Sequence, residues 1–301
     1  MTGILQPGHI EPPVGDLPRL RLAPESLFAD RAARFRQLAA GHSLEPFLHF
    51  LGALAAAQHS ARAHLPAPSL PPSTTLEQVR AHHMPPLAPA GITLDAHWRT
   101  LARRLAAATV DSLPAAGQSA ALALADAEDA ALDQAAQAFL AQRPQALPAA
   151  WVPFVAAALE VYWVHLAASL AGELDGLAEP ATLCPVCGAP PVSAMLQIGG
   201  VEQGLRYLHC SRCNSEWHFV RAQCSNCGDA RELAYYSIEG RMPWVDAEAC
   251  GHCGSYLKLI RREKDPQADA LADDVASLAL DLLMDEKGFS RSGPNPYLIA
   301  T

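Results

Sequence analysis

The eight cysteines of this 301-residue chain constrain its fold more than any other feature. They form four Cys-x-x-Cys pairs, and no cysteine is left over. The last two pairs repeat the first two at an offset of 40 residues, and 22 residues separate the two pairs within each half. The pairs are Cys184/Cys187, Cys210/Cys213, Cys224/Cys227 and Cys250/Cys253. Self-similarity at a fixed period indicates a tandem duplication of one small structural unit.

Each unit has the ligand set of a closed metal site. Two cysteines separated by two residues can present both sulfurs to one ion, and a second pair completes a tetrahedral shell. The tight turn after the second cysteine commonly needs a positive φ, which glycine and asparagine adopt most readily. The residues at these four positions are Gly188, Asn214, Gly228 and Gly254. All eight cysteines are therefore predicted metal ligands.

The duplication also predicts which pairs share an ion. If each copy is complete, Cys184/Cys187 joins Cys210/Cys213, and Cys224/Cys227 joins Cys250/Cys253; a cross-braced pairing is the alternative. A four-sulfur site suits zinc or a single iron, and zinc is the commoner structural ion. Units of about 30 residues are too small to fold by core burial alone, so the ion would contribute folding free energy.

Other uses of paired cysteines fit the sequence less well. Disulfides persist in oxidising compartments, and the N-terminus shows no basic segment followed by an apolar run, so no signal peptide is expected. Thioredoxin-like redox pairs need a βαβ context that the pattern lacks. A thiol-redox protein nevertheless stays open as an alternative.

The charge distribution bears on possible partners. The net charge is −9 and the pI about 5.7, which argues against a general nucleic-acid or anionic-membrane binder. Residues 184–264 carry a balance of +1 and the rest of the chain −10. A zinc-ribbon nucleic-acid binder, usually strongly basic, is the second alternative.

The best candidate for a membrane span is the stretch 151–172. It contains Pro153, Glu160 and His165, and an ionised Glu near the centre of a span costs about 2.5–3.5 kcal/mol on insertion scales. A helix buried in a helical bundle is the better interpretation. Reduced thiols, no signal and no clear span together predict a cytoplasmic protein.

The rest of the chain predicts an α plus small-β fold. It comprises a Pro-rich arm (1–25), an all-helical bundle (26–178), a first metal ribbon (179–222), a second metal ribbon (223–264), and a C-terminal helix and tail (265–301). Helical periodicity and proline breaks place helices near 26–39, 43–64, 75–84, 93–113, 117–142 and 150–173, and a last one from Pro266 to Gly288. Alternating apolar residues predict strands between the cysteine pairs.

No catalytic or cofactor-binding residues stand out. The sequence shows no nucleophile–base set, no cofactor-binding glycine loop and no open metal site, so we expect no enzyme. Scattered histidines, including the doublet His82-His83, are expected at surface or packing positions. Arg206, Arg221 and Arg241 are expected on a solvated surface.

Two runs resemble the formate dehydrogenase accessory protein FdhE family. The first is CPVCGAPPVSAMLQIGGVEQGLRYLHCSRCNSEWHFVRAQCSNC, residues 184–227, with the GLRYLHC segment at 204–210. The second is ADDVASLALDLLMDEKGFSRSGPNPYLI, residues 272–299, with the GFSRSGPNP tail at 288–296. The resemblance covers residues 184–299 strongly and the N-terminal half only in its helical layout.

The resemblance implies a cytoplasmic, non-enzymatic factor needed for active respiratory formate dehydrogenase. It implies a chaperone that binds the catalytic subunit before twin-arginine export. The charge and the lack of a clear span predict no nucleic-acid or membrane partner, and self-association is left open. It also implies rubredoxin-like ribbons that hold two irons at the eight cysteines, which shifts the preferred metal from zinc to iron, with zinc as the alternative. We expect the cleft between helices and ribbons, with the C-terminal tail, to bind the partner.

Overall fold

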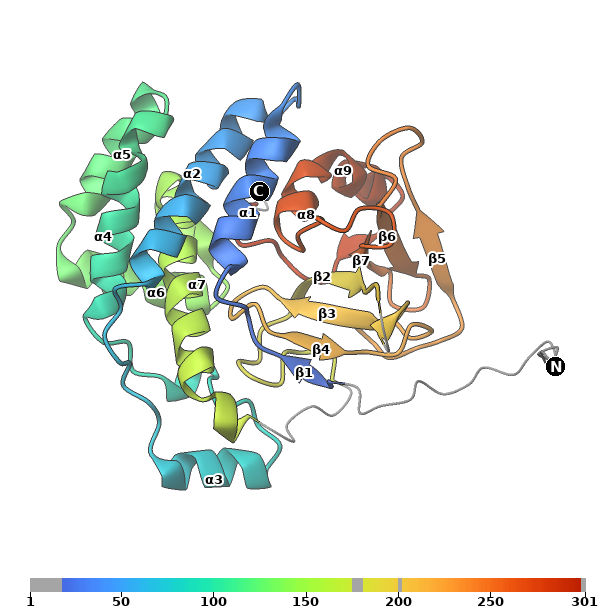
Figure 1. Ribbon diagram of the computed structural model, residues 1–301, viewed down its shortest axis with the longest axis horizontal. Coiled ribbons are helices and arrows are strands. Elements are labelled where there is room, and N and C mark those ends of the chain that lie inside the picture. Colours follow the sequence, from blue (N-terminus) through green and yellow to red (C-terminus); the bar gives the residue numbers. More distant parts are fainter. Residues whose placement is uncertain (1–17, 175–180, 200–201, 299–301) are drawn as a thin grey trace, which may run out of the picture.

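The computed structural model describes residues 18–174, 181–199 and 202–298. A helical region and a sheet region lie side by side, with α1 next to the sheet region and α4 and α5 farther away (Figure 1). The described residues thus combine the helices, the cysteine-bearing sheet and the C-terminal helices that the sequence predicts.

Seven α-helices lie within the described residues 18–174. They are α1 (Leu27–Ala39), α2 (Glu45–Arg62), α3 (Ser73–Ala81), α4 (His97–Thr109), α5 (Ala115–Ala125), α6 (Asp129–Leu140) and α7 (Val152–Ser169). Prolines mark several of the starts: Pro46 and Pro153 occupy the first turns of α2 and α7, where the missing N–H costs nothing. Pro114 precedes α5 in an extended conformation.

Helix α7 is the centre of the bundle. It packs against α2, α4 and α6, and because it is apolar on every side it is buried on every side. Within the part of the chain that the structure describes, Ala149–Ser169 is the one helix long and apolar enough to span a bilayer. Of its apolar window, 78% is buried inside the protein, so its apolar side chains form core contacts.

The single alanine-rich helix predicted over 117–142 is wrong, because the structure has two helices there. Helix α5 ends at Ala125, and Glu128 is extended before α6 begins. Arg103 stabilises the break: its guanidinium donates to the carbonyl of Ala127 and to the carboxylate of Asp129, each at 2.7 Å. A tertiary contact overrides a weak local preference for continuous helix.

The strands form one eight-stranded sheet. They are β1 (Leu20–Arg21), β2 (Pro191–Leu196), β3 (Arg206–Cys210), β4 (Glu216–His218), β5 (Leu233–Tyr236), β6 (Val245–Cys250), β7 (Ser255–Arg261) and β8 (Ser290–Arg291). Their order is β1-β4-β3-β2-β7-β6-β5, and β8 pairs with β7 outside this path. The two ribbons therefore share one sheet rather than forming separate modules.

A parallel pairing of β2 with β7 joins the ribbons, with Ala194 opposite Leu259 and Leu196 opposite Arg261. Each ribbon is itself antiparallel, as β2-β3-β4 or β5-β6-β7. The offset of 40 residues makes β5 the counterpart of β2 and β7 the counterpart of β4. Every residue of β2 is buried, which matches a central strand covered on both faces rather than the predicted alternation.

The predicted C-terminal helix is also interrupted, at Ser277 between α8 (Ala272–Ala276) and α9 (Leu278–Glu286). The ammonium of Lys258 donates to the carbonyls of Asp274 and Ser277 at the break. Leu282 of α9 is 62% exposed. The tail packs against the rest of the protein, because β8 pairs with β7 and Tyr297 is buried.

Candidate metal centres

The sulfurs of Cys184, Cys187, Cys210 and Cys213 form one cluster, and all four lie within 4.8 Å of one another. The Sγ atoms of Cys184 and Cys213 are 3.6 Å apart, and those of Cys187 and Cys210 are 3.4 Å apart. All four residues are fully buried. The cluster joins the first and second cysteine pairs, which is the sequential pairing that the duplication predicts.

The second cluster repeats this arrangement with Cys224, Cys227, Cys250 and Cys253. The Sγ distances are 3.8 Å between Cys224 and Cys253 and 3.8 Å between Cys227 and Cys250. A disulfide would need about 2.05 Å, and all eight cysteines are free. Tetrahedral ligation at about 2.3 Å places sulfurs about 3.8 Å apart, so each cluster can hold a metal ion.

The turns that present the sulfurs have the predicted backbone chemistry. Gly188, Asn214, Gly228 and Gly254 have φ values of 71°, 54°, 75° and 66°. Gly188, Gly228 and Gly254 each donate their N–H to the carbonyl of the first cysteine of their pair, at 2.8–2.9 Å. The N–H groups of Arg212 and Cys213 reach the Cys210 sulfur at 3.3 and 3.4 Å.

Hydrogen bonds to sulfur favour one thiolate in each cluster. Burial raises the pKa of the Cys187 thiol, but hydrogen bonds from the other three cysteines and the charge of Arg212 outweigh it and hold that pKa well below the usual value. Burial likewise opposes ionisation of Cys253, yet Ser255 and Asn226 lower its pKa to about 6. The thiolate is the form that binds metal.

The first cluster is attached to the helices through Asn214, which directly follows Cys213. Its amide N–H donates to Glu160 Oε1 at 2.7 Å, and its carbonyl oxygen accepts from Arg31 at 2.8 Å. Because that oxygen faces the Nε2 of His209 at 3.0 Å, His209 must donate there. One turn residue therefore bonds α1, α7 and β3.

The carboxylate of Glu160 is the centre of this buried network. Oε1 accepts from Arg31 at 2.5 Å, and Oε2 accepts from Gln58 at 2.9 Å and from the Tyr297 hydroxyl at 2.6 Å. Burial lowers the pKa of Arg31, but Asp269 and Glu160 outweigh burial and raise it. A buried ion pair of this kind is costly to break, about 3–5 kcal/mol when one partner is removed. The first metal unit, three helices and the tail are thus connected by ion pairs and hydrogen bonds.

A second group of buried charges holds the C-terminal segments. Arg34 of α1 forms two hydrogen bonds with the Asp273 carboxylate, at 2.6 and 2.9 Å. Asp274 accepts from Arg291 at 2.6 Å and from Asn295 at 2.7 Å. These contacts fix α8 and the tail against α1 and the sheet.

The two ribbons share one buried ion pair. Arg206 of β3 lies 2.8 Å from Glu248 of β6, and Arg206 is 1% exposed. The prediction that Arg206 lies on a solvated surface is wrong. Burial lowers the pKa of Arg206 and raises that of Glu248, so desolvation opposes the charges even though they are paired.

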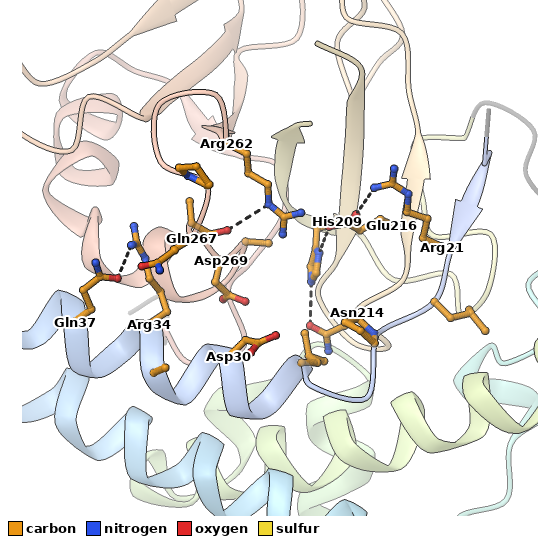
Figure 2. Close-up of a pocket in the computed structure, with 17 residues that line it drawn as sticks. Arg21, Asp30, Arg34, Gln37, His209, Asn214, Glu216, Arg262, Gln267 and Asp269 are labelled. Atoms are coloured by element: carbon orange, nitrogen blue, oxygen red, sulfur yellow. Dashed lines mark hydrogen bonds and ion pairs between the residues drawn. The ribbon is translucent and has the colours of Figure 1, made fainter. Parts of the chain in front are cut away.

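A cleft of about 750 Å³ separates α1 from the first ribbon and the loop 262–270 (Figure 2). His209 and Asn214, the neighbours of Cys210 and Cys213, form part of its lining. Arg34 lies on the α1 side of the cleft, and Arg262 lies on the opposite side, close to His209 (Figure 2). A segment bound in this cleft would contact residues adjacent to two of the cysteines.

Among the described residues, the two cysteine clusters are the only groups of three or more side chains arranged to hold a metal. The sequence patterns did not identify Arg31 and Glu160 as members of a buried network beside the first cluster. Arg31 lies three residues after Phe28 and four before Phe35, on the apolar face of α1, and Glu160 lies within a helix that is apolar all round. A charge in such a place needs a buried partner.

Comparison with known proteins agrees over nearly the whole chain. Family models described as FdhE, N-terminal, FdhE, central domain and FdhE, C-terminal domain match residues 17–178, 183–221 and 222–298. A Protein FdhE homolog of Pectobacterium carotovorum subsp. carotovorum (strain PC1) is 42% identical over 292 residues, 95% of this chain and 92% of that protein. Protein FdhE of Salmonella enteritidis PT4 is 38% identical over 288 residues, 93% and 89% of the two chains.

A solved structure shows the same fold. The crystal structure of the FdhE protein from Pseudomonas aeruginosa superposes with a TM-score of 0.83 at 39% sequence identity. The match covers 93% of this chain and 99% of that one. On these matches, this chain belongs to the FdhE family.

Proposed function

We propose that this chain is a cytoplasmic, non-enzymatic assembly factor that binds the catalytic subunit of a respiratory formate dehydrogenase before export. Membership of the FdhE family supports an accessory role for formate dehydrogenase. Binding before export is what the family resemblance implies, and the cytoplasmic compartment is also predicted by the reduced thiols and the lack of a signal and a clear span in the sequence. The closed cysteine clusters and a cleft between helices and sheet support direct binding of a partner.

The observation that carries the proposal is the closed coordination of the first centre. Four sulfurs surround its centre, and all four residues are fully buried. A fully protein-ligated site leaves no position for substrate or water, so such a site stabilises structure or transfers electrons. The buried network around Glu160 then holds the centre in a fixed place beside the cleft.

We assign the cleft of Figure 2 to the partner. Its walls come from α1, the first ribbon and the loop 262–270, so a bound segment would contact both halves of the protein. Clefts between such layers are common binding sites. Binding there would depend on the first metal unit being folded.

Iron is the metal we propose for both centres, with zinc as the alternative. The eight cysteines would hold either ion, and iron would add one-electron chemistry that zinc does not supply. Elemental analysis and an optical spectrum of freshly purified protein would distinguish iron from zinc. Thiolate-to-iron absorption with two irons per chain is expected; a colourless protein with two zincs would overturn the iron assignment, and a metal-free folded protein would overturn both.

Co-purification tests the partner. The formate dehydrogenase catalytic subunit should be retained by the wild-type chain and lost with Gln267→Trp, which places a large side chain at the exposed rim of the cleft. Gln134→Trp, on the exposed face of α6, is the matched control and should retain it. Equal retention by Gln267→Trp would move the contact away from the cleft, and no retention by the wild type would end the proposal.

A further inference from the structure

Two cavities lie on either side of Arg212, away from the cleft of Figure 2. One, of about 310 Å³, lies between the first half of α7 and the C-terminal tail. The other, of about 760 Å³, lies between α6 and the segment 89–94. Gln142 and Arg212 line both cavities, and no residue that lines either one lines the cleft. The cavities therefore meet at these two side chains.

Arg212 is fixed in position without a carboxylate partner among the described residues. Its guanidinium donates to the carbonyl of Cys187 at 3.3 Å and stacks 5.6 Å from the ring centre of Trp163. In the described part of the chain, no carboxylate lies within 4.0 Å of it. The acidic groups of the cavity walls are paired elsewhere: Glu160 with Arg31, and Asp133 with Arg99. A carboxylate of a bound ligand would be its complement.

Gln142 holds a conformation that a glycine would adopt more easily. It follows α6 with a φ of 57°, and the N–H of Arg143 returns to the carbonyl of Ala138 at 2.9 Å. This is the position after a helix end where glycine is usual. Strained backbone conformations cluster at functional sites, and here the strained residue places an amide at the junction of both cavities.

The remaining walls are mainly apolar. Phe139, Val152 and Leu159 line the smaller cavity together with Leu298 of the tail. Ile92, Leu94 and Leu140 line the larger one. Apolar walls with a few convergent polar groups are typical of ligand sites, and cavities on both sides of one arginine suit an extended ligand better than a compact one.

We propose that the two cavities form one groove, the Arg212 groove, which binds an extended peptide segment of a protein partner. An acidic side chain of the peptide pairs with Arg212, apolar side chains on either side enter the two cavities, and the Gln142 amide bonds to the peptide main chain. The inference rests on the proposed function, since it gives the bound catalytic subunit a second contact and names the chemistry of that contact.

Peptide binding tests the groove directly. Fluorescein-labelled 15-residue peptides that tile the formate dehydrogenase catalytic subunit of the same genome are titrated against the full chain by fluorescence anisotropy. Peptides that bind should carry Asp or Glu between apolar residues, and replacing that acid by its amide should weaken binding about tenfold, as expected for a lost charge-assisted hydrogen bond.

Three variants make the test specific. Arg212→Met and Gln142→Gly should each weaken binding, the first about tenfold. Arg104→Met, which removes an exposed cation of α4, should leave binding unchanged. Gln142→Gly should also raise the melting temperature, because glycine relieves the strain. It is the deciding variant if Arg212→Met changes the metal content, since Gln142 lies outside the cysteine turns.

The outcomes separate the groove from the wider proposal. Unchanged peptide affinity in both groove variants would overturn the groove, as would acid and amide peptides that bind equally. If the whole catalytic subunit binds the wild-type chain but no peptide does, the groove fails and the proposed function stands. If the subunit itself does not bind the wild-type chain, both fail.

Discussion

The two candidate metal centres have the same set of four cysteines and different surroundings. The cysteines of the first are all fully buried, whereas Cys227 of the second is exposed and Cys253 is half-buried. Asn214 of the first unit bonds to the helices, and its counterpart Gly254 has open space around it. The duplicated unit thus fixes how sulfurs are presented, while neighbouring elements decide whether the centre is internal or accessible.

The largest expected difference comes from removing a ligand. Cys213→Ser should abolish folding of the first unit and loosen the helices against the sheet, because structural metal contributes about 10–16 kcal/mol in small domains. Cys253→Ser should cost one metal ion and leave the helical region and first unit folded. Metal content, circular dichroism and melting temperature would show this. Equal loss of structure in both variants would refute the division into internal and accessible centres.

Glu160→Gln should have the next largest effect. It removes the carboxylate that pairs with Arg31 and bonds to Asn214, Gln58 and Tyr297, so the free energy of unfolding should fall by about 3–5 kcal/mol. Glu173→Gln breaks the exposed ion pair with Arg80. It should change the free energy of unfolding by less than about 1 kcal/mol. Urea unfolding of both variants is the measurement. A loss below 1 kcal/mol for Glu160→Gln would mean that the network is not what holds the first centre.

Exchanging the turn residues Asn214 and Gly254 tests the difference between the two centres, with a smaller expected effect on stability. Asn214→Gly keeps the positive φ but removes the contacts to Glu160, Arg31 and His209, which should cost about 1–3 kcal/mol in unfolding free energy. Gly254→Asn should be nearly neutral, since asparagine tolerates this conformation and nothing lies within 4 Å of an added Cβ. Thermal unfolding of both variants should separate them; similar melting temperatures would contradict the assigned role of Asn214.

The smallest effect is a pH dependence of opposite sign at two neighbouring carboxylates. Burial opposes ionisation of Asp269, but Arg31 and backbone N–H groups outweigh it and lower its pKa. Its stabilisation is therefore complete above the unfolded pKa of about 3.9 and is lost as the pH falls through the lower folded value. Burial raises the pKa of Asp273 despite Arg34, so that group costs stability as the pH rises from about 4.

Unfolding free energies of Asp269→Asn and Asp273→Asn, measured against wild type between about pH 7 and about pH 2, would show this difference in sign. For Asp269→Asn the difference from wild type should stay constant down to about pH 4 and shrink below it. For Asp273→Asn the difference should move in favour of wild type as the pH falls towards about 4. Parallel curves for the two variants would show that Arg31 and Arg34 affect their partners alike.

Local chemistry made the cysteine clusters predictable. The fixed spacing and the four turn residues could specify both the grouping of sulfurs and the positive φ values, because both depend on only a few consecutive residues. Helix boundaries followed prolines for the same reason. The splits at 126–128 and at Ser277 were not visible, because Arg103 and Lys258 approach the freed carbonyls from distant elements.

The pairing of strands and charged residues that are far apart in the sequence could not be predicted, for a different reason. No local sequence pattern predicts that β2 pairs in parallel with β7. Arg206 cannot be distinguished from a surface arginine in the sequence, because its partner Glu248 lies on a distant strand. Arg31 was closer to prediction, because its position between Phe28 and Phe35 puts it on a buried face. An ionisable residue on such a face is a signal in the sequence for a buried partner.

The way the two ribbons join has a consequence for the ends of the sheet. The first strand of one unit pairs with the last strand of the other, an arrangement that could in principle be repeated without closing on itself. At one end the short β1 covers β4; at the other, among the described residues, nothing pairs with the outer side of β5. That side is equivalent to the side of β2 that pairs with β7, so it is a template for adding strands from other molecules. A length of only four residues limits the number of hydrogen bonds such an addition could gain, which protects the protein against growth into filaments.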